Sequence, residues 1–276
     1  MMRIYFLALF GLLILQHTFA QKPENQVTAA SKVVTGAILL SDKKGPEAKA
    51  LLASLKTEWK LRADSSTAAD KTIVFSSGGA TVMIAYLDYP VNPAEITASA
   101  RLSWLWKNAA AEASRHTAQV VISVIGADNH TLDLYKIFTK TAAAVLQNTP
   151  AIGVYMNSQY LLLTKDFYLS SAHNLLNENV LPVYCWAYFG IMEEGGQSSG
   201  YTYGLRDFGL EEMEIVKMQG SASEIHAVLY DAATSVIQYN TRLQEGQPFT
   251  TIEGSKLKVR KSKAEFVDGE TFKLEF

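Results

Sequence analysis

The sequence predicts an α+β protein built from ferredoxin-like (split βαβ) units, two in tandem, with antiparallel or mixed sheets and helices on one face. Hydrophobic residues make up 48% of the 276-residue chain and charged residues 19%, which is typical of a chain with a large core. The periodicity of residues 33–125 gives the order strand, helix, strand, strand, helix, strand, which is that of a split βαβ unit. From residue 151 onward the order is similar, so we expect a second unit.

An N-terminal α+β unit is expected over residues 33–149. Pro46 opens one helix at its first turn, and Asn92 followed by proline opens the next. Residues 61–70 are small and polar and predict a loop, whereas residues 76–79 predict a hairpin turn. The expected strands are 33–40, 72–75, 80–87 and 118–125, and the expected helices are 46–59, 92–116 and 131–147.

A C-terminal α+β unit is expected over residues 150–276. Thr164 is the expected cap of a helix over residues 165–176. Ser221 and Glu224 form a capping box that opens the clearest amphipathic helix of the chain. The remaining expected strands are 151–155, 181–192, 211–218, 256–260 and 271–276, the last two forming a hairpin.

The N-terminus has the layout of a cleaved secretory signal peptide, residues 1–20. Arg3 precedes an apolar run over residues 4–15, and small residues lead to Ala20, the expected cleavage point. The run of about twelve residues is shorter than the roughly twenty needed to cross a bilayer, so no transmembrane segment is expected after cleavage. Residues 21–32 predict a flexible leader. We therefore expect an exported protein, periplasmic or extracellular.

Charge and cysteine content limit the partners and the chemistry. The net charge is −2, from 25 basic and 27 acidic residues, which does not favour a nucleic-acid partner. The expected partner is a protein or a small molecule. Cys185 is the single cysteine, so no internal disulfide is expected. Its apolar neighbours predict a buried core thiol, and the alternative is a nucleophile without a local signature.

Residues 200–214 form the most distinctive segment, with three glycines, Tyr203, Arg206 and a cluster of carboxylates. Glycine permits positive φ or a close approach of the backbone. Glu212 and Glu214 are two apart on an expected strand, which places both on one face. Two carboxylates on one face can perform acid–base chemistry or hold a hard cation. The alternative is that they form the solvated face of an amphipathic strand.

Trp104, Trp106 and His116 fall within or at the end of one expected helix. The two tryptophans would point in nearly opposite directions, one into the core and the other exposed or lining a pocket. His116, if protonated, would suit the negative end of the helix dipole. After the expected signal peptide, three further histidines are dispersed in the sequence: His130, His173 and His226. No pair has the spacing of a helical zinc site, so neither a metal nor a cofactor is expected.

Several motifs, in their order along the chain, resemble the domain of unknown function 4261 family. They are residues 90–93, residues 103–106 leading to His116 and the strand 120–124, residues 181–182, the segment 200–214 with the capped helix after it, and residues 268–271. The resemblance extends over about residues 36–276. It implies no assigned activity and no catalytic residues, and Gln119 stands where the family pattern suggests a second histidine.

Three kinds of function are consistent with these features of the sequence. We expect first a non-catalytic binding or interaction module, because catalytic signatures are missing and such folds present a sheet face or edge to partners. The alternative is a hydrolase-type enzyme with a carboxylate, arginine and histidine site between the halves. A structural envelope protein is the third. The candidate site residues are Trp104, Trp106, His116, Tyr203, Arg206, Glu212 and Glu214.

Overall fold

The structure is a computed structural model that describes residues 31–69, 71–127 and 130–275. The expected signal peptide, residues 1–20, lies outside these ranges, and so do residues 21–30 of the expected leader. Ser31 and Lys32, the last two positions of that leader, already belong to the first strand.

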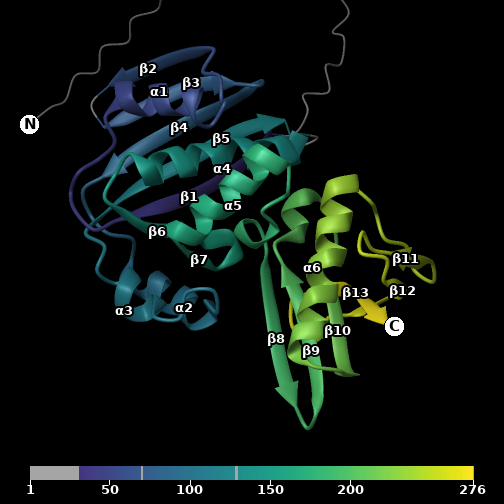
Figure 1. Cartoon of the computed structure of the whole chain (residues 1–276). Coiled ribbons are helices and arrows are strands. Elements are labelled where there is room, and N and C mark those ends of the chain that lie inside the picture. Colours follow the sequence, from purple (N-terminus) through teal and green to yellow (C-terminus); the bar gives the residue numbers. More distant parts are fainter. Residues whose placement is uncertain (1–30, 70, 128–129, 276) are drawn as a thin grey trace, which may run out of the picture.

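The first of two β-sheets has seven strands in the order β2-β3-β4-β5-β1-β6-β7, and its neighbouring strands are antiparallel (Figure 1). Valine and isoleucine, which favour pleated surfaces, dominate the central part of this sheet. β1 and β5 pair along their whole length. The strands are β1 (Ser31–Leu40), β2 (Ser65–Ala69), β3 (Thr72–Ser77), β4 (Ala80–Leu87), β5 (Ala118–Ala127), β6 (Ala151–Met156) and β7 (Leu161–Thr164).

β2 lies where the sequence predicted a loop. Its residues are serine, threonine and alanine, and all five are exposed. Such a segment has no hydrophobic alternation to reveal it, and it becomes a strand by pairing with β3 at the edge of the sheet.

The single helix expected over residues 92–116 is two helices, α2 (Pro93–Leu102) and α3 (Ala109–Ala113), joined by a connector. In the connector, the Ser103 hydroxyl donates a hydrogen bond to the carbonyl of Leu162 in β7, at 2.6 Å. Trp106 inserts into a small core, and its Nε1 donates to the carboxylate of Glu112 at 2.6 Å. These contacts outweigh the helical spacing, so Trp104 and Trp106 lie on the connector rather than on a helix.

Helices cover both faces of the first sheet, whereas the sequence predicted one face. Ile38 packs into the larger core with α1, α4 and α5, while its neighbour Leu39 points to the other face and packs against Ile96 of α2 and Ala113 of α3. Both faces of the inner strands are apolar, so both need a cover. The helices of the first group are α1 (Ala48–Thr57), α4 (Thr131–Gln147) and α5 (Lys165–Glu178) (Figure 1).

The second sheet has six strands in the order β11-β12-β13-β10-β9-β8. β10 and β13 are parallel and the other described pairs are antiparallel, so the sheet is mixed. α6 (Ala222–Tyr239) packs on β8, β9 and β10 and begins at the predicted capping box of Ser221 and Glu224. The strands are β8 (Tyr188–Glu194), β9 (Gln197–Tyr203), β10 (Met213–Gln219), β11 (Pro248–Thr250), β12 (Lys256–Lys263) and β13 (Glu270–Glu275). Across the described ranges, no helix is long and apolar enough to cross a membrane.

The apolar run 181–192 is only partly the strand that the sequence predicted. It first forms a 3₁₀ turn, Val183–Cys185, and β8 begins at Tyr188. The first part of the run is apolar because it passes through the core, which a periodicity argument cannot distinguish from a buried strand.

The strand order of the first sheet differs from that of a split βαβ unit. In such a unit, one antiparallel strand separates the two strands that a helix connects. β1 and β2, on either side of α1, are instead separated by β3, β4 and β5. In the second sheet, α6 follows three strands. The α+β class with antiparallel and mixed sheets is confirmed, but tandem ferredoxin-like units are not, because element order along a chain does not determine which strands pair.

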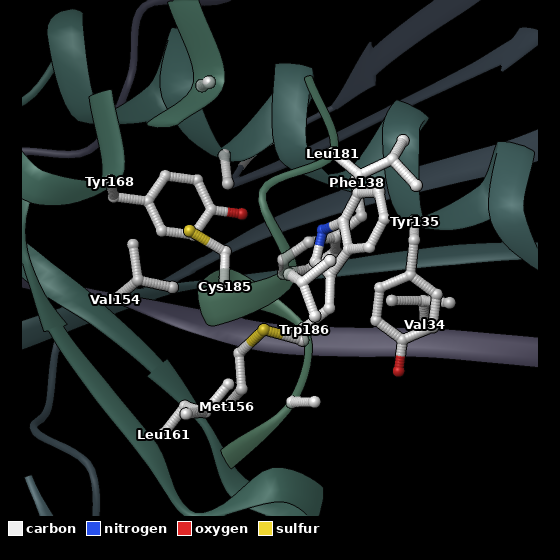
Figure 2. Close-up of a cluster of buried hydrophobic side chains, with 14 of the residues drawn as sticks. Val34, Tyr135, Phe138, Val154, Met156, Leu161, Tyr168, Leu181, Cys185 and Trp186 are labelled. Atoms are coloured by element: carbon white, nitrogen blue, oxygen red, sulfur yellow. The ribbon is translucent and has the colours of Figure 1, made fainter. Parts of the chain in front are cut away.

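A shared core joins the two sheets. β6 and β7 pair into the first sheet, so the sheets divide the chain after α5 rather than at residue 150. Figure 2 shows Cys185 and Trp186, which precede β8, among side chains of the first half such as Tyr135, Tyr168 and Met156. Burial raises the pKa of the Cys185 thiol to about 12. The prediction of a buried core thiol is confirmed, and a reactive thiolate is not favoured.

Candidate functional site

Glu212 holds the turn that connects β9 to β10. Its buried carboxylate accepts hydrogen bonds from the amides of Gly204 (2.8 Å) and Arg206 (3.2 Å) and from the Thr202 hydroxyl (2.8 Å). Burial raises the pKa of Glu212, although these three donors act in the opposite direction. The carboxylate therefore serves as an internal acceptor for its own turn.

Glu214 forms a buried ion pair with Lys273 of β13. Lys273 Nζ lies 2.5 Å from Glu214 Oε2, and the side chains are 5% and 0% exposed. The amides of Glu265 and Phe266 also donate to this carboxylate, at 3.0 and 3.1 Å. Burial acts to raise the pKa of Glu214, but Lys273 and the two amides outweigh it, so the pKa lies below its ordinary value. The three protons of Lys273 are used, because Nζ also donates to Thr271 and to a backbone carbonyl.

The prediction that these carboxylates form a solvated strand face is therefore wrong. Glu212 is 2% exposed and Glu214 is fully buried. Glu212 also precedes β10, which begins at Met213, so the alternation of a strand does not relate the two side chains. Neither carboxylate is placed at an opening where it could meet a ligand.

His116 has a structural position just after α3. Its Nε2 accepts a hydrogen bond from the amide of Val91 (2.8 Å), so Nδ1 carries the proton and donates to the carbonyl of Ala113 (2.6 Å). Burial lowers the pKa of the ring, which the bond to Ala113 opposes. The expected contact with the end of a helix is present, but the expected positive charge is not.

Tyr203 is the last residue of β9, and Arg206 lies in the turn that follows it. The exposed Arg206 guanidinium donates from Nη2 to the carbonyls of Asp268 (2.6 Å) and Glu270 (3.3 Å), which ties this turn to the β12–β13 hairpin. Tyr203 is partly buried, and its ring centre lies 5.5 Å from that of Tyr160. Burial raises the pKa of Tyr203.

The hydrolase hypothesis needs His116, Arg206, Glu212 and Glu214 at one site, and no direct contact joins the four side chains. Arg206 touches Glu212 only through its backbone amide. Among the hydrogen bonds and ion pairs of the described ranges, none joins His116 to Arg206, Glu212 or Glu214. The pocket that Arg206 lines has none of the other three side chains in its lining.

Trp104 and Trp106 have different environments, as the sequence suggested. Trp106 is 4% exposed and belongs to the small core under α2 and α3. Trp104 is 51% exposed, and its ring meets the rings of Tyr184 and His226 edge-on at centroid distances of 5.9 and 4.9 Å. Because Tyr184 precedes β8 and His226 belongs to α6, Trp104 extends from the first half to contact the second.

A pocket of about 530 Å³ lies beside Trp104, between the α2–α3 connector, β8 and the first turns of α6. His226 contributes to its wall and stacks on Tyr184 at a centroid distance of 5.5 Å. Burial lowers the pKa of His226, and its buried Nε2 has no hydrogen-bond partner among the described residues. The lining includes Arg101, Ser103, Trp104, Tyr188, Phe189 and His226. The arrangement is a pocket with an aromatic wall and a few polar side chains, which is the usual composition of a small-molecule site.

Sequence reasoning identified Trp104 but missed Tyr188 and His226. The four-residue spacing of Ala222 and His226 places both on one side of α6, which is the signal that was available. No spacing relates this helix face to Trp104, since the two segments are distant along the chain.

Residues 201–275 match the family model described as Domain of unknown function (DUF4261). Searches of curated proteins and of solved structures gave no match. The matched segment is narrower than the resemblance expected over residues 36–276, and it includes Arg206, both buried carboxylates and α6. The predicted resemblance is confirmed for this segment: residues 201–275, from the end of β9 to β13, are similar to the domain of unknown function 4261 family.

Proposed function

We propose that this protein is an exported, non-catalytic binding module that takes the aromatic ring of a small molecule in the pocket beside Trp104. The observation that carries the proposal is the half-exposed Trp104 ring at an aromatic pocket, together with the unpaired Nε2 of His226. The apolar run and small residues of positions 1–20 support export.

The energetics favour a bound ring. An aromatic side chain buries about 150–250 Å², so the exposed half of Trp104 offers roughly 100 Å². At about 25 cal/mol per Å², covering it contributes about 2–3 kcal/mol. His226 Nε2 is closed off from solvent, so a ligand hydroxyl reaches it only when the ring turns toward the pocket. An unsatisfied buried nitrogen costs about 1–3 kcal/mol, which such a contact would recover. Both gains are realised only when the pocket is filled.

The charge state of His226 indicates the polar group of the ligand. Because burial lowers its pKa, the imidazole is neutral at neutral pH. A neutral ring nitrogen exchanges hydrogen bonds with a hydroxyl or an amide rather than pairing with a carboxylate. A phenol-like ligand, with one ring and one hydroxyl, fits these requirements.

Titration with p-cresol is expected to shift the indole N–H resonance of Trp104 selectively. The chain has four tryptophans. The other three donate their indole protons to buried or partly buried acceptors: Trp59 to Gln147, Trp106 to Glu112 and Trp186 to Thr139. Trp104→Phe assigns the resonance. Trp104→Ala is expected to weaken p-cresol binding about tenfold, equivalent to about 1.4 kcal/mol.

Tyr239→Ala provides the matched control, because Tyr239 is 65% exposed at the far end of α6. This variant should bind p-cresol like the unaltered protein. The proposal fails if Trp104→Ala binds equally well, or if the three buried indoles shift as much as Trp104.

Export makes its own prediction. Protein expressed from the full sequence in a secreting bacterium and recovered outside the cytoplasm is expected to begin at Gln21, as measured by intact mass. Recovery of folded protein that keeps Met1, in the cytoplasm alone, would contradict export without affecting the binding proposal.

A further inference from the structure

We propose a second ligand site, for a carboxylate or phosphate group carried on a small apolar body, in the pocket lined by Arg206 and Arg242. This pocket has a volume of about 450 Å³ and includes residues at the C-terminal end of α6. The pocket beside Trp104 includes residues at the other end of the same helix. The 18 residues of α6 make it about 27 Å long, so the two sites are separate.

Carbonyl oxygens, rather than carboxylates, hold the two guanidinium groups in place. Arg242 Nη1 donates to the carbonyl of Gly209 at 2.9 Å, and Arg206 Nη2 donates to the carbonyls of Asp268 and Glu270. Within the part of the chain that the structure describes, neither arginine forms an ion pair. A carbonyl oxygen carries only a partial negative charge, so these hydrogen bonds do not neutralise the guanidinium groups. They do hold both groups in position before a ligand arrives.

Two left-handed glycines allow this arrangement. Gly209 has a φ of +69°, and a Cβ added there would lie 3.7 Å from Arg242 Nη2. Gly269 has a φ of +84°, and a Cβ there would lie 3.4 Å from Arg206 Nη2. Each guanidinium thus lies against a bare backbone turn. A guanidinium has five N–H donors, more than either arginine uses in these contacts, so donors remain for an oxyanion.

The charge at the pocket suits a single anionic group. Lys261 also lines it and pairs with two carboxylates, Glu211 (3.1 Å) and Glu270 (3.4 Å). With Arg206 and Arg242 included, three positive charges face these two negative ones, so one net positive charge remains. The C-terminal end of α6 opposes an anion with about half a charge, which this net charge outweighs.

The remaining lining requires an apolar body on the ligand. Leu210, Val236 and Phe272 line the pocket and are 7%, 2% and 7% exposed. A free inorganic ion would leave this surface without contact, whereas an aromatic or aliphatic acid would cover it. Benzoate and phenyl phosphate are therefore suitable probes, and benzyl alcohol is the neutral probe of similar shape.

Calorimetric titration at low salt tests this site. Benzoate, phenyl phosphate or both are expected to bind at least tenfold more tightly than benzyl alcohol, with affinity falling as salt is added. Arg242→Gln should weaken the binding of both anions about tenfold. Arg242→Lys keeps the positive charge but loses the two parallel N–H donors of the guanidinium, so it should have a smaller effect. Whichever of benzoate and phenyl phosphate binds more tightly shows whether the site prefers a carboxylate or a phosphate group.

Arg260→Gln is the matched control, because it removes the same charge from an exposed arginine of β12 that is not in the lining. The proposal is overturned if Arg260→Gln weakens binding as much as Arg242→Gln, or if benzyl alcohol binds the unaltered protein as well as the anions do. The comparison of benzyl alcohol with the anions uses only the unaltered protein, so it remains valid even if Arg242→Gln does not fold. Trp104→Ala should leave anion binding unchanged, which separates this site from the proposed function.

Discussion

Lys273→Met is expected to lower the free energy of unfolding by about 3–5 kcal/mol, because it leaves the buried Glu214 carboxylate without its cation. Glu214 is fully buried, and Lys273 Nζ lies 2.5 Å from it. The two remaining amide donors do not replace a full charge. Urea denaturation followed by circular dichroism measures the change, with an unaltered slope showing that the unfolded state is unchanged.

A double-mutant cycle separates the lost pair from lost packing. Glu214→Gln combined with Lys273→Met should cost less than Lys273→Met alone, because no unpaired charge remains. Lys71→Met is the matched control: Lys71 and Asp88 form an exposed pair at 2.8 Å, which solvent screens, so its loss should have little effect on stability. Equal effects of Lys71→Met and Lys273→Met would contradict the role assigned to the buried pair.

The same pair gives the expected pH dependence. The folded pKa of Glu214 is lowered, so its stabilisation is present above the unfolded value of about 4.3 and is lost as the pH falls through the folded pKa. In Lys273→Met, protonation of Glu214 also removes the unpaired negative charge that destabilises this variant. The stability difference between the unaltered protein and Lys273→Met should therefore shrink below about pH 4.

Trp186→Ala is expected to lower the free energy of unfolding by about 3–5 kcal/mol through the cavity that it leaves. Trp186 is fully buried where the two halves share one core (Figure 2). Its ring centre lies 5.6 Å from that of Tyr135 and 6.0 Å from that of Phe208. Its Nε1 also donates to the Thr139 hydroxyl at 2.9 Å, so the variant loses a buried hydrogen bond. Thermal and urea denaturation should agree on the loss.

Trp104→Ala is the matched control for this substitution, because it removes the same side chain from a half-exposed position. We expect it to cost about 1 kcal/mol or less. A large loss of stability in Trp104→Ala would mean that this ring is structural, and would count against a ligand pocket beside it. A loss below about 1 kcal/mol in Trp186→Ala would contradict the shared core.

The elements that sequence predicted well have a strong local pattern. α4 has the predicted bounds, because its apolar residues recur along one continuous face. α6 begins at the predicted box of Ser221 and Glu224, because both partners of that box lie within one turn. β2 and β9 were missed, since β2 is wholly exposed and β9 is rich in serine and glycine, so neither has the alternation of an amphipathic strand.

The candidate site was less predictable than the fold class. Glu212 and Glu214 had a spacing that suggests a shared face, yet one closes its own turn and the other pairs with Lys273. Their partners lie on other segments, and the sequence offered no sign of which segments would meet. Trp104 and Trp106 were both candidates, because tryptophans two apart on one helix point in nearly opposite directions, and only the structure shows that Trp104 is the exposed one.

The chain alone determined the α+β class, most helix boundaries and the core position of Cys185, because each depends on apolar spacing within one segment. The tertiary structure decided which strands pair, that helices cover both faces of the first sheet, and that Trp104 and His226 meet at one pocket. Such contacts join residues far apart in the chain, and the free energy that selects them comes from packing and from the pairing of buried charges. Neither is encoded in the spacing of residues along a single element.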